Sequence, residues 1–268
     1  MKPLRDSRKR LGKSLRPSVR KPSRSKSDRY FLIAPGAERG GTILLDGSEL
    51  HHCVGVSRAR VGDVVKLLDG HGGTYEARVA RIGEHEAVLD VISFSKAIEP
   101  PPVDIAIGII KAPRFDLAVE KCTELGVRRL IPFRAERSVW RGAGDEGDLK
   151  VERIRRKIVA TCKQSGRPYF PEIDRVESFE SLVERTAAYA ASFVADQDSA
   201  LSGPDGVQAG DGPVLGIVGP EGGLSPTEME RLVAKGAKLL SLGPFRLRTE
   251  TAAICLSYRL MIRRREFV

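Results

Sequence analysis

Two apolar strands near the C-terminus of this chain each lead into a glycine-containing loop and then into a helix. The first strand begins at Val214 and ends in the loop Gly219 to Gly223, with the sequence GPEGG. The second strand, Lys238 to Leu242, ends in Gly243 and passes through Arg248 to Thr251 into an apolar helix. Glycine at a strand end lets the chain turn sharply and exposes backbone N–H and C=O groups that a Cβ would shield. The repeated pattern predicts a small-molecule site made of two adjacent loops.

The residues after the first loop favour the start of a helix. Ser225 is followed by Pro226 and, three residues after the serine, by Glu228. Serine and glutamate at this spacing form a capping box, and proline suits the first helical position because the N–H that it lacks would have no helical partner there. The sequence therefore predicts a strand–loop–helix unit at this point.

The C-terminal part of the chain, residues 99–268, alternates apolar strands with helices. Besides the two strands above, the predicted strands are Val103 to Ile110, Leu130 to Phe133 and Tyr189 to Val194, and the longer predicted helices are Phe115 to Leu125 and Leu149 to Ser165. Such alternation is typical of a parallel sheet with helices on both faces. Ligands bind such sheets at the carboxyl ends of the strands. We therefore predict an α/β domain with both glycine loops at its ligand-binding end.

Residues 29–98 show a different pattern, of short strands separated by turns. The predicted strands are Tyr30 to Ile33, Thr42 to Leu45, Val64 to Leu68, Thr74 to Ile82 and Ala87 to Ile92, and only Ser48 to Ser57 looks helical. The segment Asp69 to Gly73 is typical of a hairpin turn. We interpret this part as a small β-barrel domain. It is joined to the α/β domain by a stiff linker at Glu99 to Pro102, because successive prolines exclude helix.

Most of the formal net charge of +10 lies in the first 28 residues, where eleven basic residues against two acidic ones give +9. This segment has too few apolar residues to form a core, and we predict a disordered basic tail. Three roles stay open. The tail can attract a polyanion such as RNA through counterion release, or be a solvated extension without a function, or be an organelle transit peptide, which the absence of a leucine face disfavours.

Several classes of protein are disfavoured by the sequence. No apolar run approaches the roughly 20 residues of a membrane span, so we expect a soluble, cytoplasmic protein. The adjacent histidines at positions 51 and 52 are expected to lie on a helix, and no metal site is predicted. Gly142 to Gly147 matches G-x-G-x-x-G, but it follows no strand and its two acidic residues would repel a pyrophosphate, so we interpret it as a flexible loop. The four cysteines lack C-x-x-C spacing and are expected to be free thiols: Cys53, Cys122, Cys162 and Cys255.

The two glycine loops contain no serine, cysteine or histidine nucleophile, which argues against covalent hydrolytic catalysis. They offer backbone groups together with Glu221, Arg248 and Glu250. Such a set suits binding an uncharged or zwitterionic cofactor and orienting a second substrate beside it. Structural roles stay open as alternatives: Arg248 and Glu250 can form an ion pair or a helix cap, and Glu221 can form a hydrogen bond inside its own turn.

Two long segments carry a resemblance to a known family. GPEGGLSPTE at 219–228 and LGPFRLRTETAA at 242–253 closely resemble the C-terminal signatures of the RsmE family, the small-subunit (16S) ribosomal RNA uridine N3-methyltransferases of the SPOUT superfamily. The match is specific because both motifs occur in the right order and spacing. Shorter matches extend the resemblance over about residues 29–265: His51-His52, Val61 to Asp63, Glu120 to Val127, Glu136 to Ser138 and Gln164 to Arg167.

The resemblance implies a PUA-like RNA-binding barrel, a methyltransferase domain whose last segment threads a trefoil knot, a homodimer, and S-adenosyl-L-methionine held by the knot loops. The cofactor-binding residues that it implies are Gly219, Pro220, Glu221, Gly222, Gly223, Leu242, Gly243, Leu247, Thr251 and Ala252. The RNA-binding residues that it implies are Arg29, Arg137, Arg167 and Arg246. For Arg137 and Arg167, contact with the dimer partner and a surface salt bridge stay open as alternatives.

The reaction implied by the resemblance is methylation of uracil N3 in one uridine of 16S ribosomal RNA. Neutral N3–H has no lone pair to attack with, so an enzyme must stabilise the uracil anion or supply a base. We predict that Arg248 stabilises charge on a uracil carbonyl oxygen and that Glu250 accepts the proton. The base must also be splayed out of its RNA context, because pairing buries N3.

The sequence departs from the family pattern at Phe245 and Arg246, where an arginine followed by an aliphatic residue is usual. Arg246 is the candidate replacement for the family arginine. Two other function classes stay open. A pure RNA-binding module would not need two glycine loops, and a related methyltransferase acting on a 2′-hydroxyl or on tRNA would share the fold.

Overall fold

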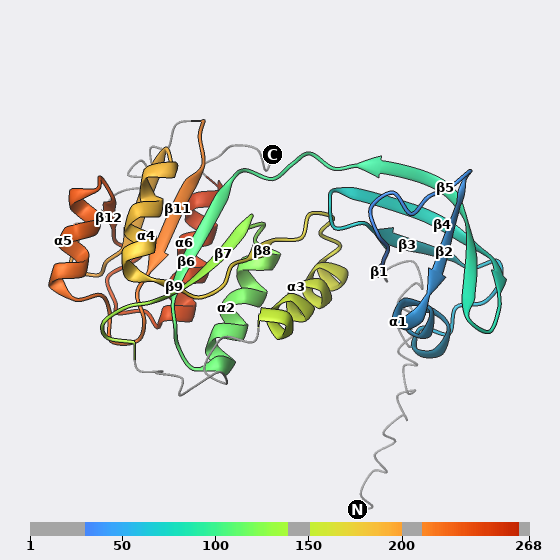
Figure 1. The fold of residues 1–268 in the computed structure, drawn as a ribbon, viewed down its shortest axis with the longest axis horizontal. Coiled ribbons are helices and arrows are strands. Elements are labelled where there is room, and N and C mark those ends of the chain that lie inside the picture. The colour runs from blue at the N-terminus through green and yellow to red at the C-terminus, as the bar shows by residue number, and fades with distance from the viewer. Residues whose placement is uncertain (1–29, 139–150, 200–210, 263–268) are drawn as a thin grey trace, which may run out of the picture.

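The computed structural model describes residues 30–138, 151–199 and 211–262. The predicted basic tail at 1–28 and the predicted loop at Gly142 to Gly147 lie outside these ranges. Two sheets, each with its own hydrophobic core, are joined by an extended segment that runs from β5 (Glu86–Lys96) to β6 (Val103–Gly108) (Figure 1). Within the described ranges, no helix is long and apolar enough to cross a membrane.

The N-terminal sheet has five strands in the order β1-β3-β4-β5-β2. β1 runs parallel to β3, and the other pairs are antiparallel. Along β2, Ile43 and Leu45 point inward and pack in one cluster with Phe31 and Leu89. The predicted strands are confirmed, and the predicted helix is an α-helical turn followed by a π-helix. The elements before β5 are β1 (Tyr30–Leu32), β2 (Thr42–Asp46), α1 (Gly47–Leu50), η2 (His51–Val56), β3 (Val64–Leu68) and β4 (Gly73–Ile82).

The predicted hairpin turn connects β3 and β4 and is closed by Asp69. Its Oδ1 accepts hydrogen bonds from the backbone N–H groups of His71 and Gly73, each at 2.8 Å. Gly70 and Gly72 have φ angles of 75° and 97°, which strain residues with a Cβ. An aspartate followed by glycines therefore forms this turn for a local physical reason.

The C-terminal sheet is parallel throughout, which confirms the predicted α/β architecture. Its strand order is β12-β10-β11-β6-β7-β8, with β9 pairing with β7. Every residue of β6 and β11 is buried, as expected of strands covered on both faces. The elements after β6 are α2 (Ala112–Glu124), β7 (Arg129–Arg134), α3 (Val151–Ser165), β8 (Glu172–Ile173), β9 (Glu177–Ser178), α4 (Phe179–Arg185), η4 (Thr186–Ala188), β10 (Ala191–Ala195), β11 (Val214–Val218), α5 (Pro226–Ala234), β12 (Lys238–Leu240) and α6 (Thr249–Ile262).

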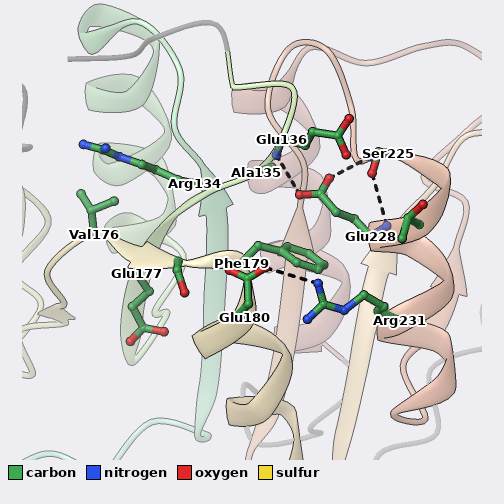
Figure 2. Close-up of a pocket in the computed structure, with 12 residues that line it drawn as sticks. Arg134, Ala135, Glu136, Val176, Glu177, Phe179, Glu180, Ser225, Glu228 and Arg231 are labelled. Atoms are coloured by element: carbon green, nitrogen blue, oxygen red, sulfur yellow. Dashed lines mark hydrogen bonds and ion pairs between the residues drawn. The ribbon is translucent and has the colours of Figure 1, made fainter. Parts of the chain in front are cut away.

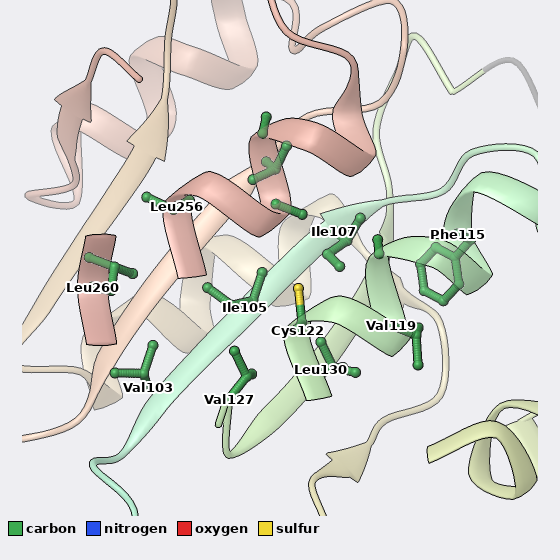
Figure 3. Close-up of a cluster of buried hydrophobic side chains, with 14 of the residues drawn as sticks. Val103, Ile105, Ile107, Phe115, Val119, Cys122, Val127, Leu130, Leu256 and Leu260 are labelled. Carbon is green, nitrogen blue, oxygen red and sulfur yellow. The ribbon is translucent and has the colours of Figure 1, made fainter. Parts of the chain in front are cut away.

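Helices cover both faces of this parallel sheet. On one face, Ile105 and Ile107 of β6 lie in a cluster with Phe115 of α2 and Leu256 of α6 (Figure 3). The next residue of β6, Ala106, belongs to a second cluster with side chains of α4 and α5. Because β6 divides its side chains between the two clusters, it lies at the centre of the domain.

The two sheets meet through the segment that follows α3. The backbone N–H of Gly72 donates to the carbonyl of Pro168 at 2.9 Å, and that of Phe170 donates to the carbonyl of Gly70 at 3.0 Å. Lys163 of α3 also forms an ion pair with Glu49 of α1 at 2.7 Å. These contacts connect the hairpin of the first sheet to the helix that covers the second.

All four cysteines are free thiols, as predicted. Burial raises the pKa of Cys122 and of Cys162 to about 12 and that of Cys53 to about 11. Only thiolates are strong nucleophiles and metal ligands, so these three residues are inert at neutral pH. Among the described residues, no group of three or more histidine, cysteine, aspartate or glutamate side chains could hold a metal ion.

Candidate cofactor and active site

A cavity of about 560 Å³ lies at the carboxyl ends of β10, β11 and β12. The two predicted glycine loops line it, together with the residues that follow β10 and one residue from the start of α2. Its volume is within the range of roughly 300–1,000 Å³ that small-molecule sites occupy. The loops therefore come together as the sequence predicted, at the end of the sheet where ligands bind.

Hydrogen bonds hold the two glycine loops against each other. The Thr249 hydroxyl at the start of α6 donates to the carbonyl of Gly219 at 3.1 Å, and Arg246 Nη2 donates to the carbonyl of Glu221 at 3.3 Å. Within the first loop, the N–H of Gly223 donates to the carbonyl of Pro220 at 2.8 Å. These bonds fix the backbone that forms the cavity wall before any ligand binds.

Most of the predicted cofactor-binding residues line this cavity. Those that do are Gly219, Pro220, Glu221, Gly223, Leu242, Gly243, Leu247 and Ala252. Two do not. Gly222 packs instead against Arg137, since a Cβ on it would lie 3.0 Å from both the Cβ and the carbonyl oxygen of that arginine. Thr251 is exposed on α6.

Arg114, which the sequence interpretation missed, organises the charges beside the cavity. It lies in the first turn of α2, immediately after β6, and lines the cavity. Its guanidinium forms an ion pair with the Glu221 carboxylate, and its Nε lies 3.9 Å from Oε1 of Glu250. The signal that could have identified it is its position just past the carboxyl end of a buried strand that neighbours β11.

The two predicted catalytic residues occupy different environments. Arg248 is exposed and lines the cavity. Glu250 is only 6% exposed and lies behind the lining, in contact with Arg114. Its second oxygen, Oε2, is buried and has no hydrogen-bond partner among the described residues. A buried carboxylate oxygen without a partner is energetically costly, and such groups are typical of functional sites.

The predicted RNA-binding arginines are not all equivalent in the structure. Arg246 is exposed at the cavity, and Arg137 is exposed beside Gly222. Arg29 lies outside the described residues. The guanidinium of Arg167 donates to the backbone carbonyls of three residues at the end of α2. Burial lowers the pKa of this arginine to about 10, which leaves it charged at neutral pH. Arg167 therefore stabilises the fold by holding the end of α2 and the chain that follows it.

Replacing Arg167 with alanine is expected to destabilise the protein without changing its affinity for RNA. The substitution leaves carbonyls of Thr123, Gly126 and Val127 without their donor. Hydrogen bonds to charged groups contribute about 1.5–3 kcal/mol each, so we expect the loss of three of them to lower the free energy of unfolding by about 4.5 kcal/mol or more. Denaturant titration and RNA binding measured on the same sample check this, and weaker RNA binding at unchanged stability would contradict it.

A second cavity, of about 650 Å³, lies between the ends of β7 and β9 and the starts of α4 and α5 (Figure 2). Glu228 accepts hydrogen bonds from the backbone N–H of Glu136 and of Ser225, each at 2.8 Å, which confirms the predicted capping box. Arg231 pairs with Glu180 at 3.3 Å. These polar groups of the second cavity are thus hydrogen-bonded or paired with one another. The smaller cavity instead presents the backbone of the two glycine loops, and the unpartnered Oε2 of Glu250 lies close to its lining. The smaller cavity is therefore the candidate active site.

Comparison with protein families shows the class to which the chain belongs. Residues 98–261 match a family described as an RNA methyltransferase domain, and residues 45–92 match an RNA methyltransferase PUA domain. The parallel α/β sheet, the PUA-like domain and the cavity at the glycine loops thus define an RNA methyltransferase. A ribosomal RNA small subunit methyltransferase E from Mycobacterium bovis is 33% identical over 228 residues, which cover 83% of this chain and 87% of the relative. The chain belongs to the ribosomal RNA small subunit methyltransferase E (RsmE) family.

Solved structures show the same fold. A protein from Legionella pneumophila, solved in complex with the bound cofactor SAM, matches with a TM-score of 0.75 and 25% identity over 87% of this chain and 97% of its own. A ribosomal RNA small subunit methyltransferase E from Neisseria gonorrhoeae, bound to S-adenosyl methionine, matches with a TM-score of 0.76 and 24% identity over 85% of this chain and 94% of its own.

Proposed function

We propose that this protein uses S-adenosyl-L-methionine to methylate N3 of one uridine in the 16S ribosomal RNA of the small subunit. The observation that carries the proposal is the meeting of two glycine loops at one cavity. The names of the relatives support the choice of ribosomal RNA, and the cofactor bound by the Legionella protein supports the choice of methyl donor. The expected site of action is the cytoplasm.

The residues that line the cavity fit S-adenosyl-L-methionine. Leu242 and Leu247 supply apolar surface, and the loops supply backbone polar groups. Asp196 and Asp198, which follow β10 and which the sequence interpretation missed, add two carboxylates to the lining. The bound cofactor supplies a methyl group on a positively charged sulfur atom. Carboxylates and backbone carbonyls suit its cationic groups, while loop N–H groups suit its carboxylate.

The path of the chain supports a knotted arrangement of the C-terminal segment. β12 lies at one edge of the sheet beside β10, yet the next helix, α6, packs on β6 and β11 near the sheet centre. The chain between them runs beside the Gly219 loop, to which Thr249 is hydrogen-bonded. We infer that this segment threads a trefoil knot, which is an exception to ordinary chain topology.

The residues around the cavity can perform the proton transfer that the reaction requires. Arg248, at the cavity wall, is positioned to stabilise negative charge on a uracil carbonyl oxygen. Glu250 supplies the proton acceptor. Its Oε2 atom has no hydrogen-bond partner among the described residues, so no such bond has to break when this oxygen takes the proton. Arg114 holds Glu250 and Glu221 in place through its two ion pairs. Arg248 and the Arg114–Glu250 ion pair are thus the charged groups that this mechanism uses.

We assign the RNA-binding role to residues 29–98 as a PUA-like domain, with Arg137 and Arg246 beside the cavity making phosphate contacts, and the methyltransferase role to residues 99–268. Phosphate contacts position an RNA without reading its sequence. The basic tail at 1–28 would add a salt-dependent attraction to the RNA.

The product of the reaction tests the proposed function. Small ribosomal subunits from a strain that lacks this enzyme would be incubated with the protein and labelled S-adenosyl-L-methionine, and the modified nucleotide identified by mass spectrometry. We expect one 3-methyluridine in 16S ribosomal RNA. A 2′-O-methylated nucleotide, or methylation of tRNA alone, would show that the protein is a different member of the same superfamily.

The exposed side of α6 supports the proposal of a homodimer. Thr251, Tyr258 and Ile262 are exposed along this helix, with Tyr258 at 56% and Ile262 at 47%, and Cys255 is partly exposed between them. Their spacing of three and four residues places them on one stripe. Large side chains exposed together in this way are typical of an interface. We therefore propose that α6 packs against a second copy of the chain.

Replacing both Tyr258 and Ile262 with lysine is expected to convert the dimer to a monomer, because two charges would enter a desolvated interface. Sedimentation velocity measures the change. The matched control is Val233→Lys on α5, where valine is 45% exposed and outside the stripe, and this variant should stay dimeric. A dimer that persists in the double variant would show that another surface forms the interface.

A further inference from the structure

Phe245 is exposed at the mouth of the candidate active site. It lies in the loop between β12 and α6, lines the cavity, and is 79% exposed. Burying a phenylalanine side chain is favourable by about 1.5–3 kcal/mol, so a ring left in water beside a ligand cavity indicates a partner that covers it. The loop is anchored on both sides, by Ser241 Oγ donating to the Gly243 carbonyl at 3.2 Å and by Thr249. The ring is therefore presented by a fixed backbone.

The charges around Phe245 favour a nucleic acid as that partner. Arg246 and Arg248 follow it in the loop, are exposed, and line the same cavity. The nearby Glu221 carboxylate is paired with Arg114, while the carboxylates of Asp196 and Asp198 line the cavity where the chain leaves β10. The phosphate contacts of this proposal are therefore those of Arg246 and Arg248, on the loop that carries Phe245. An exposed aromatic ring flanked by arginines is the combination that binds single-stranded RNA, where the ring stacks on a base and the guanidinium groups contact phosphates.

We propose that Phe245 is the stacking platform that holds a splayed-out RNA base at the mouth of the cavity. The proposal rests on the proposed methyltransferase function and names the residue that positions its substrate. A base stacked on this ring lies at the cavity that Arg114 and Arg248 also line.

A second copy of the chain is the other occupant to test. The exposed stripe on α6 begins at Thr251 and continues to Ile262, away from the loop that carries Phe245. Phe245 belongs to the lining of the cavity, whereas none of the exposed residues of that stripe does. This separation favours RNA over the partner subunit as the group that covers the ring.

Two substitutions test the stacking role. Phe245→Leu keeps apolar bulk and removes the aromatic face, while Phe245→Tyr keeps the face and is the matched control. Stacking on an aromatic residue is worth about 5- to 150-fold in affinity per base. We expect Phe245→Leu to raise KM for small subunits by a factor in this range with little change in kcat, and Phe245→Tyr to stay within about threefold of the wild type. Calorimetry should show unchanged binding of S-adenosyl-L-methionine in both.

A direct binding probe separates stacking from charge. A uridine decamer and an abasic decamer with the same ribose-phosphate backbone would be titrated against wild type and Phe245→Leu. We expect the leucine variant to bind the uridine decamer more weakly and the abasic decamer equally well. Equal loss for both probes, no loss for either, or dissociation of a dimer in sedimentation velocity would overturn the stacking role. If the wild type itself fails to bind S-adenosyl-L-methionine, the proposed function fails instead.

Discussion

Glu250→Gln is expected to slow methyl transfer by about 10²–10⁴-fold, the range associated with loss of a general acid or base. Glutamine preserves the size of the side chain but cannot accept the imide proton. The side chain is 6% exposed, and Oε2 has no hydrogen-bond partner among the described residues, so the substitution breaks no contact made by that oxygen. Single-turnover methylation of small subunits with saturating cofactor measures the effect on the chemical step.

A double-mutant cycle decides whether Glu250 acts as the base or only positions Arg114. The two residues are 3.9 Å apart, close enough for their effects to be coupled. If Glu250 accepts the proton, Glu250→Gln should cost at least a further tenfold when added to Arg114→Ala. If the double variant is no slower than Arg114→Ala alone, Glu250 works only through the arginine, and the base is another group. Unchanged rates in all three variants would remove both residues from the mechanism.

Gly108→Ala is expected to weaken cofactor binding by about 100-fold, although residue 108 does not line the cavity. Gly108 ends β6, and a Cβ on it would lie 2.6 Å from Cδ of Pro220 and 2.9 Å from the carbonyl carbon of Gly219. Contacts this short do not occur, so the first glycine loop would have to move. A misplacement of about 1 Å can cost about 10²-fold in reaction rate. We expect an effect of the same order on the affinity for the cofactor that this loop holds. Calorimetry with S-adenosyl-L-methionine measures the dissociation constant.

Gly216→Ala is the matched control for this prediction, because it adds the same methyl group to the neighbouring strand, β11. There the new Cβ would meet the ends of three side chains, those of Ile105, Leu256 and Leu260, at 2.7–2.9 Å. Overpacking of a core costs about 1–3 kcal/mol of stability, which both variants should lose. Only Gly108→Ala should lose cofactor affinity. Equal weakening in both would show that affinity follows stability and not the placement of the loop.

Local chemistry made much of the fold and site predictable from the sequence. The capping box at Ser225 and the turn at Asp69 depend on residues within a few positions of each other, and both are present as expected. Strands with continuous apolar runs, such as β6, indicated a parallel sheet, and a parallel sheet places the loops after its strands at one end. The meeting of the two glycine loops therefore followed from the pattern of strands and helices.

Contacts between distant segments could not be predicted in the same way. Arg114 and Glu221 are 107 positions apart, and they meet only because β11 inserts between β10 and β6. Arg167 was predicted to bind RNA from its motif, and no sequence pattern indicated its hydrogen bonds to carbonyls 40 to 44 residues away. β8 and β9 have two residues each, too few for a periodic pattern, and they were not predicted. Such features depend on tertiary packing that a sequence pattern does not encode.

A crystal structure of the protein with S-adenosyl-L-methionine bound tests the central claim most directly. The cofactor should occupy the cavity at the ends of β10, β11 and β12. It should contact both the loop Gly219 to Gly223 and the loop that follows β12, and its methyl group should point toward Arg248. Density for the cofactor in the cavity between β9, α4 and α5, or contact with only one of the two glycine loops, would contradict the account.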